Sequence, residues 1–521
     1  MKKLFFCVLS IPFIGLSQNN NTNNSTKNQD ELNPNSLLHF TLSETGINSE
    51  LSEIGTTFFK DKFLIISNKK RRHTKTTFNK SLNTYNNNIY CTDVDKELDL
   101  SYPLQFSKVL DSENNEGAMT FSKDENTIYY TQTDGESSNF KLYKASLDVD
   151  IQGYWKDITE LKITTDDYSV ETPFLNHSDN KLYFSSNMPG GYGGYDIYSA
   201  DITENGTITN IKNLGNNVNT SSNEKYPFIS SDNKYIYFSS EGHNGYGGYD
   251  VFRSSITNNN YTNTVNLGPS LNTKKDEVSF ILAEPNKGYI SINKIDNRED
   301  FDVYRFTTEQ KEQELTISVV ENNLNTKLPN VDVLITDEFG NKITETKTNE
   351  NGEVTIKSSP LTQYKIVSNK DGYNTETTTI TPSISNPKIN EVIALKVKGS
   401  EIKPIDNNLS IDKIFFDFDR ATIKKESQVT LLKVVSLLNE NPDMKISINA
   451  HTDSKGPEKY NQTLSEKRAK STYDFLINKG ADKSRLTFKG FGESQLLNKC
   501  NVCTKVQDQE NRRVEFKINI N

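Results

Sequence analysis

The sequence has few of the residues from which most catalytic and metal sites are built. Its 521 residues include four cysteines, five histidines and one tryptophan. We find no Gly-x-Ser-x-Gly elbow, no His-Glu-x-x-His pair, no P-loop and no dinucleotide fingerprint. These absences argue against the common hydrolase, metalloprotease and nucleotide-dependent classes. We therefore expect a protein that is not an enzyme and that needs no cofactor and no metal.

The chain also lacks an excess of positive charge and any apolar run long enough to cross a membrane. Its formal net charge is −9, which argues against nucleic acid as a partner. The apolar run at 4–16 is shorter than the about 20 residues that a membrane helix needs. It follows two lysines and ends at small residues, so residues 1–17 predict a secretory signal peptide. Cys7 lies inside this run, too early for a lipoprotein box, so we expect an exported, soluble mature protein, periplasmic in a diderm bacterium.

Three cysteines follow the signal peptide, and two of them are close together. Cys500 and Cys503 are separated by two residues, a spacing that fits a redox motif, half of a zinc site or a small structural disulfide. The pair lies in a polar stretch, and no second pair is available to complete a zinc site. In an oxidising compartment a loop disulfide is the favoured interpretation. Cys91 is then expected to be unpaired and buried.

Residues 18–36 are rich in Asn, Thr and Ser and predict a disordered tether, because they cannot bury enough apolar surface to offset the entropy of ordering.

Residues 37–310 then repeat. An aromatic residue ending a short strand pattern recurs every 52–55 residues, at Tyr90, Tyr143, Tyr198, Phe252 and Tyr304. Each unit contains several short strands and no helical periodicity, which predicts an all-β propeller of five or six blades. Leu37 to Ile54 would supply a closing strand or part of a sixth blade.

Two of the repeats are nearly identical. Residues 181–186 match 235–240, with Tyr-Phe-Ser-Ser in both, and Gly-Gly-Tyr-Asp ends at Asp196 and at Asp250. These motifs resemble the TolB-like propeller repeats of bacterial periplasmic proteins. The glycine-rich loops suit a ligand site, with tyrosines for stacking and the aspartates for a cation or a sugar hydroxyl. They equally suit interstrand turns, in which the aspartate caps backbone amides, and their recurrence at one position of the repeat favours turns. The basic run at 69–73 is interpreted as a solvated loop.

Residues 311–398 change pattern to alternating half-buried strands. The strand patterns are at 315–320, 331–335, 353–356 and 364–367, with turn residues between them. About seven strands in this length predict an immunoglobulin-like β-sandwich. The segment resembles the carboxypeptidase regulatory-like domains that serve as spacers in exported bacterial proteins. Residues 399–410 are read as a linker.

Residues 411–521 alternate strands with helices and predict an α/β sandwich. The expected strands are 411–416, 444–450, 485–489 and 513–520, and the expected helices are 422–438 and 461–478. Asp453 follows one strand, and Arg468 lies about two turns into the next helix. Together they suit a zwitterionic ligand, with the carboxylate meeting an ammonium and the guanidinium meeting a carboxylate. A weak surface salt bridge is the alternative on spacing alone.

The motifs of this segment are specific. They include Phe-Asp-Phe-Asp at 416–419 with its preceding Phe415, His-Thr-Asp at 451–453, Asn461 to Ala469, Gly-Phe-Gly-Glu at 490–493 and Asn-Arg-Arg-Val-Glu at 511–515. They resemble the OmpA C-terminal domain, the peptidoglycan-binding module of outer-membrane proteins, although Ala450 stands where glycine is common. The resemblance implies that the ligand is the diaminopimelate of the stem peptide. It implies peptidoglycan-binding roles at these positions: Asp453, Arg468, Asn461, Asp419, Arg512, Arg513 and Thr452.

From these observations we expect a noncovalent peptidoglycan anchor or adaptor of the periplasm, associated with the outer membrane. The propeller would present a surface to an outer-membrane protein. The order of domains is similar to that of cell-wall anchors of Bacteroidota type IX secretion and gliding machinery, without their tetratricopeptide segment. The alternative is a propeller that binds or cleaves a glycan and is localised by the C-terminal domain, which would need a carboxylate pair in the central funnel.

Overall fold

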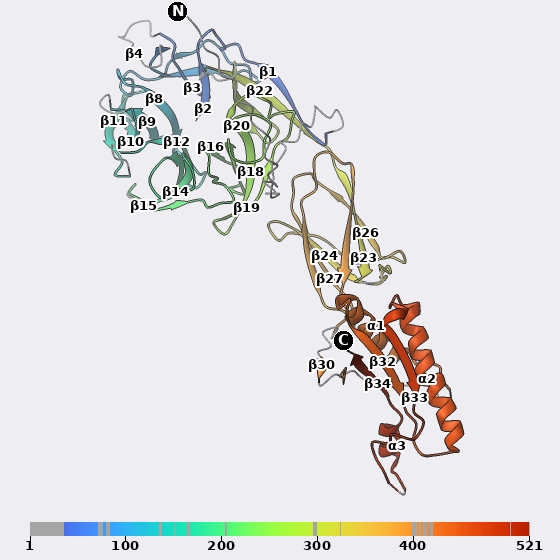
Figure 1. Ribbon diagram of the computed structural model, residues 1–521. Coiled ribbons are helices and arrows are strands. Elements are labelled where there is room, and N and C mark those ends of the chain that lie inside the picture. The colour runs from blue at the N-terminus through green and yellow to red at the C-terminus, as the bar shows by residue number, and fades with distance from the viewer. Residues whose placement is uncertain are drawn as a thin grey trace, which may run out of the picture.

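The computed structural model describes residues 36–70, 77–79, 84–134, 138–148, 150–151, 153–163, 167–203, 206–294, 300–322, 325–398, 404–405, 408–409, 414, 416, 420–500 and 502–519. The predicted signal peptide and most of the predicted tether, Asp419 and the basic residues 71–73 therefore lie outside the described residues. Figure 1 shows three bodies in chain order: a group of sheets, a smaller pair of sheets, and a C-terminal body that holds the helices. The first and the last lie at opposite ends of an elongated molecule.

The first body consists of five four-stranded antiparallel sheets, in which neighbouring strands mostly follow one another along the chain. The first sheet holds β2 (Glu53–Phe59), β3 (Lys62–Ser67), β6 (Asn88–Asp93) and β7 (Leu104–Gln105), beside a hairpin of β4 (Phe78–Asn79) and β5 (Thr84–Tyr85). The second holds β8 (Glu116–Phe121), β9 (Thr127–Thr133), β10 (Phe140–Leu147) and β11 (Trp155–Glu160). The third holds β12 (Val170–Leu175), β13 (Lys181–Ser186), β14 (Asp196–Ile202) and β15 (Ile208–Asn213). The fourth holds β16 (Glu224–Ile229), β17 (Tyr235–Ser240), β18 (Asp250–Thr257) and β19 (Asn260–Asn266).

The fifth sheet joins the two ends of this region. It holds β20 (Glu277–Glu284), β21 (Lys287–Asn293) and β22 (Phe301–Gln310), and its fourth strand is β1 (Leu38–Glu44), which pairs antiparallel with β22. The first strands of the sheets contact one another in a closed cycle, from β2 through β8, β12, β16 and β20 back to β2. We call residues 38–310 the five-sheet ring. Its seam is apolar: the ring of Phe63 in the first sheet stacks on that of Tyr289 in the fifth, with centroids 4.3 Å apart.

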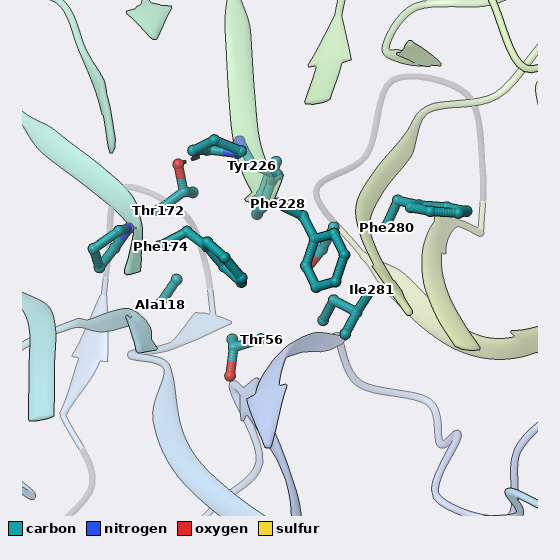
Figure 2. Close-up of a pocket in the computed structure, with 11 residues that line it drawn as sticks. Thr56, Ala118, Thr172, Phe174, Tyr226, Phe228, Phe280 and Ile281 are labelled. Atoms are coloured by element: carbon teal, nitrogen blue, oxygen red, sulfur yellow. Dashed lines mark hydrogen bonds between the residues drawn. The ribbon is translucent and has the colours of Figure 1, made fainter. Parts of the chain in front are cut away.

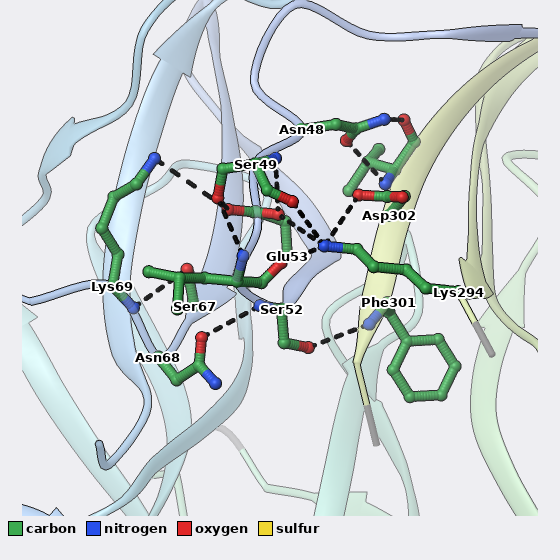
Figure 3. A network of polar contacts seen from close by, with 12 residues as sticks. Asn48, Ser49, Ser52, Glu53, Ser67, Asn68, Lys69, Lys294, Phe301 and Asp302 are labelled. Carbon is green, nitrogen blue, oxygen red and sulfur yellow. Dashed lines mark hydrogen bonds and ion pairs between the residues drawn. The ribbon is translucent and has the colours of Figure 1, made fainter. Parts of the chain in front are cut away.

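A buried polar network crosses the same seam (Figure 3). The ammonium of Lys294, which follows β21, donates to the carbonyl of Ser49 at 2.6 Å and pairs with Asp302 at 3.2 Å. It also lies 4.0 Å from the fully buried carboxylate of Glu53. Lys69 lies 3.9 Å from the same carboxylate, so this residue of the basic run contributes to the fold. Burial raises the pKa of Glu53, and the hydrogen bond from Ser49 and the attraction of the two lysines offset only part of this rise.

The second body is a pair of packed sheets. One holds β23 (Gln313–Glu321), β26 (Glu353–Ser358) and β29 (Lys388–Leu395), with β23 and β29 parallel. The other holds β24 (Asp332–Asp337), β25 (Lys342–Lys347), β27 (Tyr364–Asn369) and β28 (Glu376–Ile380). Alternating residues of both sheets, such as Ile317 and Ile366, are fully buried in one apolar core. Hydrogen bonds join it to the ring, including Arg253 Nη2 to the carbonyl of Leu361 at 2.8 Å.

The third body is a five-stranded sheet with helices. The sheet order is β30 (Pro404–Ile405), β31 (Asn408–Leu409), β34 (Val514–Asn519), β32 (Lys445–Ala450) and β33 (Leu486–Gly490). The long helices are α1 (Lys425–Glu440) and α2 (Glu458–Asn478), with the short η1 (Lys483–Arg485) before β33. Leu431, Val434, Val435 and Leu438 of α1 are buried against the sheet, at the helical spacing seen in the sequence. No helix of the described ranges is long and apolar enough to cross a membrane.

One expectation for this chain needs correction, and one helix was not predicted. The two C-terminal cysteines lie in a loop, as expected, but a third helix, α3 (Lys505–Asn511), begins two residues after Cys503. Thr504 caps α3 through a reciprocal capping box with Gln507, a pattern that sequence inspection overlooked. Cys91 is unpaired, but it is only partly buried rather than buried, although its strand β6 lies between β3 and β7 in the first sheet.

Candidate functional site

The predicted site residues of the third body gather around the loop between β32 and α2. The backbone amide of His451 donates to the carbonyl of Arg513, and that of Thr452 donates to the carbonyl of Gly492, both at 2.9 Å. The loop is therefore hydrogen-bonded on one side to the start of β34 and on the other to the turn after β33. Its position follows from the sheet, in which β32 lies between β34 and β33.

Asp453 is fixed by contacts to both carboxylate oxygens. The residue is 8% exposed. Oδ1 accepts the backbone N–H of Lys455 at 3.1 Å, and Oδ2 pairs with the guanidinium of Arg512. The Arg512 side chain is 41% exposed, so the ion pair joins a guanidinium at the surface to a buried carboxylate. This arrangement presents a negative group whose orientation is set before any ligand arrives.

Arg468 lies on α2 and is 7% exposed. Its Nε donates to the carbonyl of Arg420 at 3.1 Å, and its guanidinium lies over the ring of Phe416, 5.1 Å from the centroid. These contacts tie α2 to the segment before α1. The predicted site residue Asp419 belongs to that segment, between Phe416 and Arg420, and lies outside the described residues.

The described contacts of Asp453 and Arg468 do not include each other. The carboxylate pairs with Arg512 because β34 runs antiparallel to β32, with Ala450 opposite Val514, and this register places position 512 beside the loop. Arg468 is ten residues along α2 from its first residue, about 15 Å along the axis at 1.5 Å per residue. The described contacts therefore hold the two groups by different neighbours.

Asn461 connects the loop to the helix that carries Arg468. It lies in the first turn of α2 and is 2% exposed. Its Nδ2 donates to the carbonyl of Asp453 at 3.2 Å, to that of Lys455 at 3.3 Å, and to Oε2 of Glu493. Asn461, one of the residues that the resemblance predicted for the site, thus braces the backbone of the Asp453 loop. Glu493, which supports this brace, was noted in the sequence only as part of the Gly-Phe-Gly-Glu motif.

The remaining predicted residues occupy distinct places. Thr452 is 2% exposed, and within the described chain its hydroxyl has no hydrogen-bond partner. Arg513 turns away from Asp453: its Nε donates to Glu515 at 2.6 Å and its Nη1 to the carbonyl of Gln495 at 3.2 Å. His451 stacks on Phe491, with centroids 5.3 Å apart. Burial, aided by the nearby charge of Arg513, lowers the pKa of His451 to about 4, so it is neutral at pH 7.

The two C-terminal cysteines form a disulfide with their Cα atoms 5.2 Å apart. The loop that they close is bonded to α3 by Asn511, whose Oδ1 accepts the N–H of Asn498 at 2.9 Å and whose Nδ2 donates to the carbonyl of Asn498 at 3.1 Å. Asp508 of α3, 2% exposed as a side chain, pairs with Lys455 at 2.5 Å. Sequence inspection did not single out Lys455 or Asp508, because their pairing depends on a helix that it did not predict.

Comparison with known proteins matches this body to a family. Residues 415–512 match the OmpA family. The match covers the site loop, α2 and α3, and it leaves the five-sheet ring and the paired sheets without a family assignment.

Individual relatives match the same part of the chain. The peptidoglycan-associated lipoprotein of Brucella melitensis is 34% identical over 93 residues, which are 18% of this chain and 55% of the lipoprotein. Outer membrane protein A of Escherichia fergusonii is 36% identical over 115 residues, 20% of this chain and 47% of that protein. The chain thus spans about half the length of these relatives. The solved peptidoglycan-associated lipoprotein of Burkholderia pseudomallei is 23% identical, with 20% of this chain and 89% of that chain covered and a TM-score of 0.20.

Outside the OmpA-family segment, the ring holds a pocket at the meeting point of its first strands (Figure 2). Phe174, Phe228 and Ile281 lie beside the hydroxyl groups of Thr56 and Thr172 in its lining, together with Ala118, Pro173, Tyr226, Pro227, Ser279 and Phe280. None of these lining residues is a carboxylate. Across the described ranges, no group of three or more His, Cys, Asp or Glu side chains is arranged to hold a metal ion.

The Gly-Tyr-Gly-Gly-Tyr-Asp loops of the ring are turns. Asp196 accepts the backbone amides of Tyr192 and Gly193, and Asp250 accepts those at the equivalent positions of the next repeat. Gly193 also permits close packing, because a Cβ there would lie 2.1 Å from the carbonyl oxygen of Ser222. The interpretation of these loops as capped turns is therefore confirmed, and the aspartates are committed to backbone groups.

Proposed function

We propose that residues 411–521 bind peptidoglycan noncovalently, by the diaminopimelate of the stem peptide. Asp453 receives the ammonium of the ligand and Arg468 its carboxylate. Asn461 holds the loop of Asp453, and Thr452, Arg512 and, by the family resemblance alone, Asp419 contribute to binding. Arg513 acts through Glu515 at the edge of the site.

One observation carries this proposal: Asp453 is buried, oriented through both oxygens, and braced by Asn461 to the helix that bears Arg468. The groups of such a site are already ordered before the ligand binds, so binding does not carry the entropy cost of ordering them. The match to the OmpA family over 415–512 supports the ligand class, as does a relative that is named for its association with peptidoglycan.

Binding to purified sacculi tests the proposal. The full chain is compared with Asp453→Ala and Arg468→Ala in a pull-down, and each is expected to lose most of the binding. Lys470→Ala is the matched control, because Lys470 lies on the same helix with a 59% exposed side chain and pairs with Asp474 at the surface. Retention of full binding by both site variants would reject the mechanism.

The five-sheet ring is, in this proposal, a five-bladed propeller that serves as a platform for an outer-membrane protein. The ring and the OmpA-family segment lie at opposite ends of the molecule (Figure 1), a geometry suited to an adaptor. The protein then acts in the periplasm between the outer membrane and the wall, as anchors of type IX secretion or gliding-type machinery do. Co-purification of an outer-membrane protein with the full chain, lost when the ring is deleted, is the expected result.

A second candidate function is glycan binding at the pocket of the ring, whose lining offers the aromatic rings and hydroxyl groups that contact sugars. The cavity of about 20 Å³ has room for about one water molecule, so a sugar enters only if the lining moves, and without a carboxylate the lining offers no acid and base for cleavage. A glycan array with the Asp453→Ala chain separates this function from wall binding. Binding that persists in this variant and is lost in Tyr226→Ala would favour the glycan role.

A further inference from the structure

Helix α3 and the disulfide loop before it lie against the Asp453 loop. Two ion pairs join them, one between Lys455 and Asp508 and one between Asp453 and Arg512. Lys455 and Asp453 are two residues apart on the loop, and Asp508 and Arg512 are one helical turn apart at the end of α3. The contacts therefore hold the loop at two neighbouring points.

Helix α3 cannot provide this fixed position without support. It has seven residues, whereas an isolated helix needs about 12–15 to be even marginally stable in water. Three constraints surround it: the disulfide of Cys500 and Cys503 before its cap, the capping box at Thr504, and the paired hydrogen bonds of Asn511 to Asn498. The disulfide closes a tight turn at the point where the chain enters the helix. These constraints fix both ends of α3.

We propose that α3 and its disulfide loop are a positioning clamp for Asp453, with Lys455, Asp508, Asn511 and the two cysteines as positioning residues. The inference rests on the proposed function of Asp453 and deepens it. The buried carboxylate of Asp508 draws Lys455 toward α3, and this sets the backbone whose amide orients Oδ1 of Asp453. Arg512, at the end of the same helix, orients Oδ2. Tight binding of the ammonium of diaminopimelate thus depends on a disulfide that does not touch the ligand.

The test uses the full chain and three changes: Cys500→Ser with Cys503→Ser, Asp508→Asn, and Lys455→Met. Each is expected to weaken sacculus binding about tenfold, within the range of coupling between residues of one network. Lys455→Arg keeps the charge and is expected to restore near wild-type binding. Cys91→Ser, which changes a cysteine of the ring, is the control for a cysteine-to-serine change that breaks no disulfide.

Hydrogen exchange provides a readout that is independent of ligand. The amides of 453–456 and of α3 are expected to exchange faster in the clamp variants, while β33 and the centre of α2 stay protected and show that the module is folded. Unchanged exchange at 453–456, or wild-type sacculus binding by the clamp variants while Asp453→Ala loses it, would overturn the clamp. Wild-type binding by Asp453→Ala would instead overturn the proposed function itself.

Discussion

The guanidinium of Arg512 pairs with the carboxylate of Asp453, although 59 positions separate the two residues in the chain. The partner that spacing suggested, Arg468, bonds instead to the carbonyl of Arg420 and covers Phe416. The site therefore has two separately supported charges. Asp453 belongs to the group formed by its loop and α3, and Arg468 belongs to the group formed by α2 and the segment before α1.

Replacing Arg512 by Ala tests the first of these groups. Because the Asp453 carboxylate is only 11% exposed and loses its charged partner, we expect a loss of about 1–3 kcal/mol in the free energy of unfolding. Affinity for sacculi is expected to fall about tenfold, since the carboxylate of Asp453 loses the contact that orients Oδ2. Arg485→Ala is the matched control, because Arg485 bonds to the carbonyls of Leu438, Asn441 and Pro442 and not to the Asp453 loop. A loss of binding with Arg485→Ala as large as that with Arg512→Ala would contradict this assignment.

Replacing Asn461 by Ala removes the brace between the loop and α2. Two backbone carbonyls and the Glu493 carboxylate lose a buried donor, so the module is expected to lose about 1–3 kcal/mol of stability. Hydrogen exchange of β32 and β33 measures this loss. Trp155, the one tryptophan of the chain, is buried in the ring and serves as an internal control, because its fluorescence transition should not move. If the fluorescence transition reported a loss of stability equal to that measured by exchange at β32, the effect would not be local.

Much of the third body could be predicted from sequence because its patterns are local. The apolar spacing of α1 and the glycine after α2 locate these helices to within three residues of their observed bounds. The ring's sheets likewise follow from the repeated strand patterns. By contrast, the Asp453–Arg512 pair depends on the register of β34 against β32, which no local pattern records.

Helix α3 was missed for a different physical reason. Seven residues give too few turns for an apolar periodicity, and both Val502 before it and Val506 within it are exposed, at 91% and 66%. Its stability comes from the cap at Thr504, the disulfide and Asn511 rather than from an apolar face. The Thr504–Gln507 pair was the available signal, since a threonine followed three residues later by glutamine marks a helix start.

His451 predicts how the stability of the third body depends on pH. Burial, then the charge of Arg513, lowers its pKa from 6.5 to about 4. Between these values the unfolded chain binds a proton that the folded chain does not, so the stabilisation is complete above pH 6.5 and is lost as the pH falls toward 4. The loss is of order 3 kcal/mol. His451→Phe keeps the stacking on Phe491 and should flatten the profile of β32 exchange against pH, whereas His39→Gln, at an exposed histidine, should not. An unchanged profile in His451→Phe would place the dependence elsewhere.

The carboxyl of Glu277 predicts that the stability of the ring depends on pH in the opposite direction. Its carboxyl is fully buried, and although it accepts from the N–H and hydroxyl of Thr273, burial raises its pKa from 4.5 to about 8. Over this interval the folded chain binds the proton more tightly than the unfolded chain. The contribution is therefore fully present below pH 4.5 and is lost as the pH rises through 8.

Urea unfolding of the ring, followed by Trp155 fluorescence at pH 5 and pH 8, measures this effect. Glu277→Gln keeps the size of the side chain and a neutral acceptor. It is expected to lower the difference in unfolding free energy between the two pH values by a few kcal/mol, mostly by raising the stability at pH 8. Glu284→Gln is the control, because that side chain is 52% exposed on the same strand. If Glu277→Gln retained the full difference between the two pH values, the buried carboxyl would have to be ionised throughout. In that case its hydrogen bonds from Thr273 would outweigh the cost of burial.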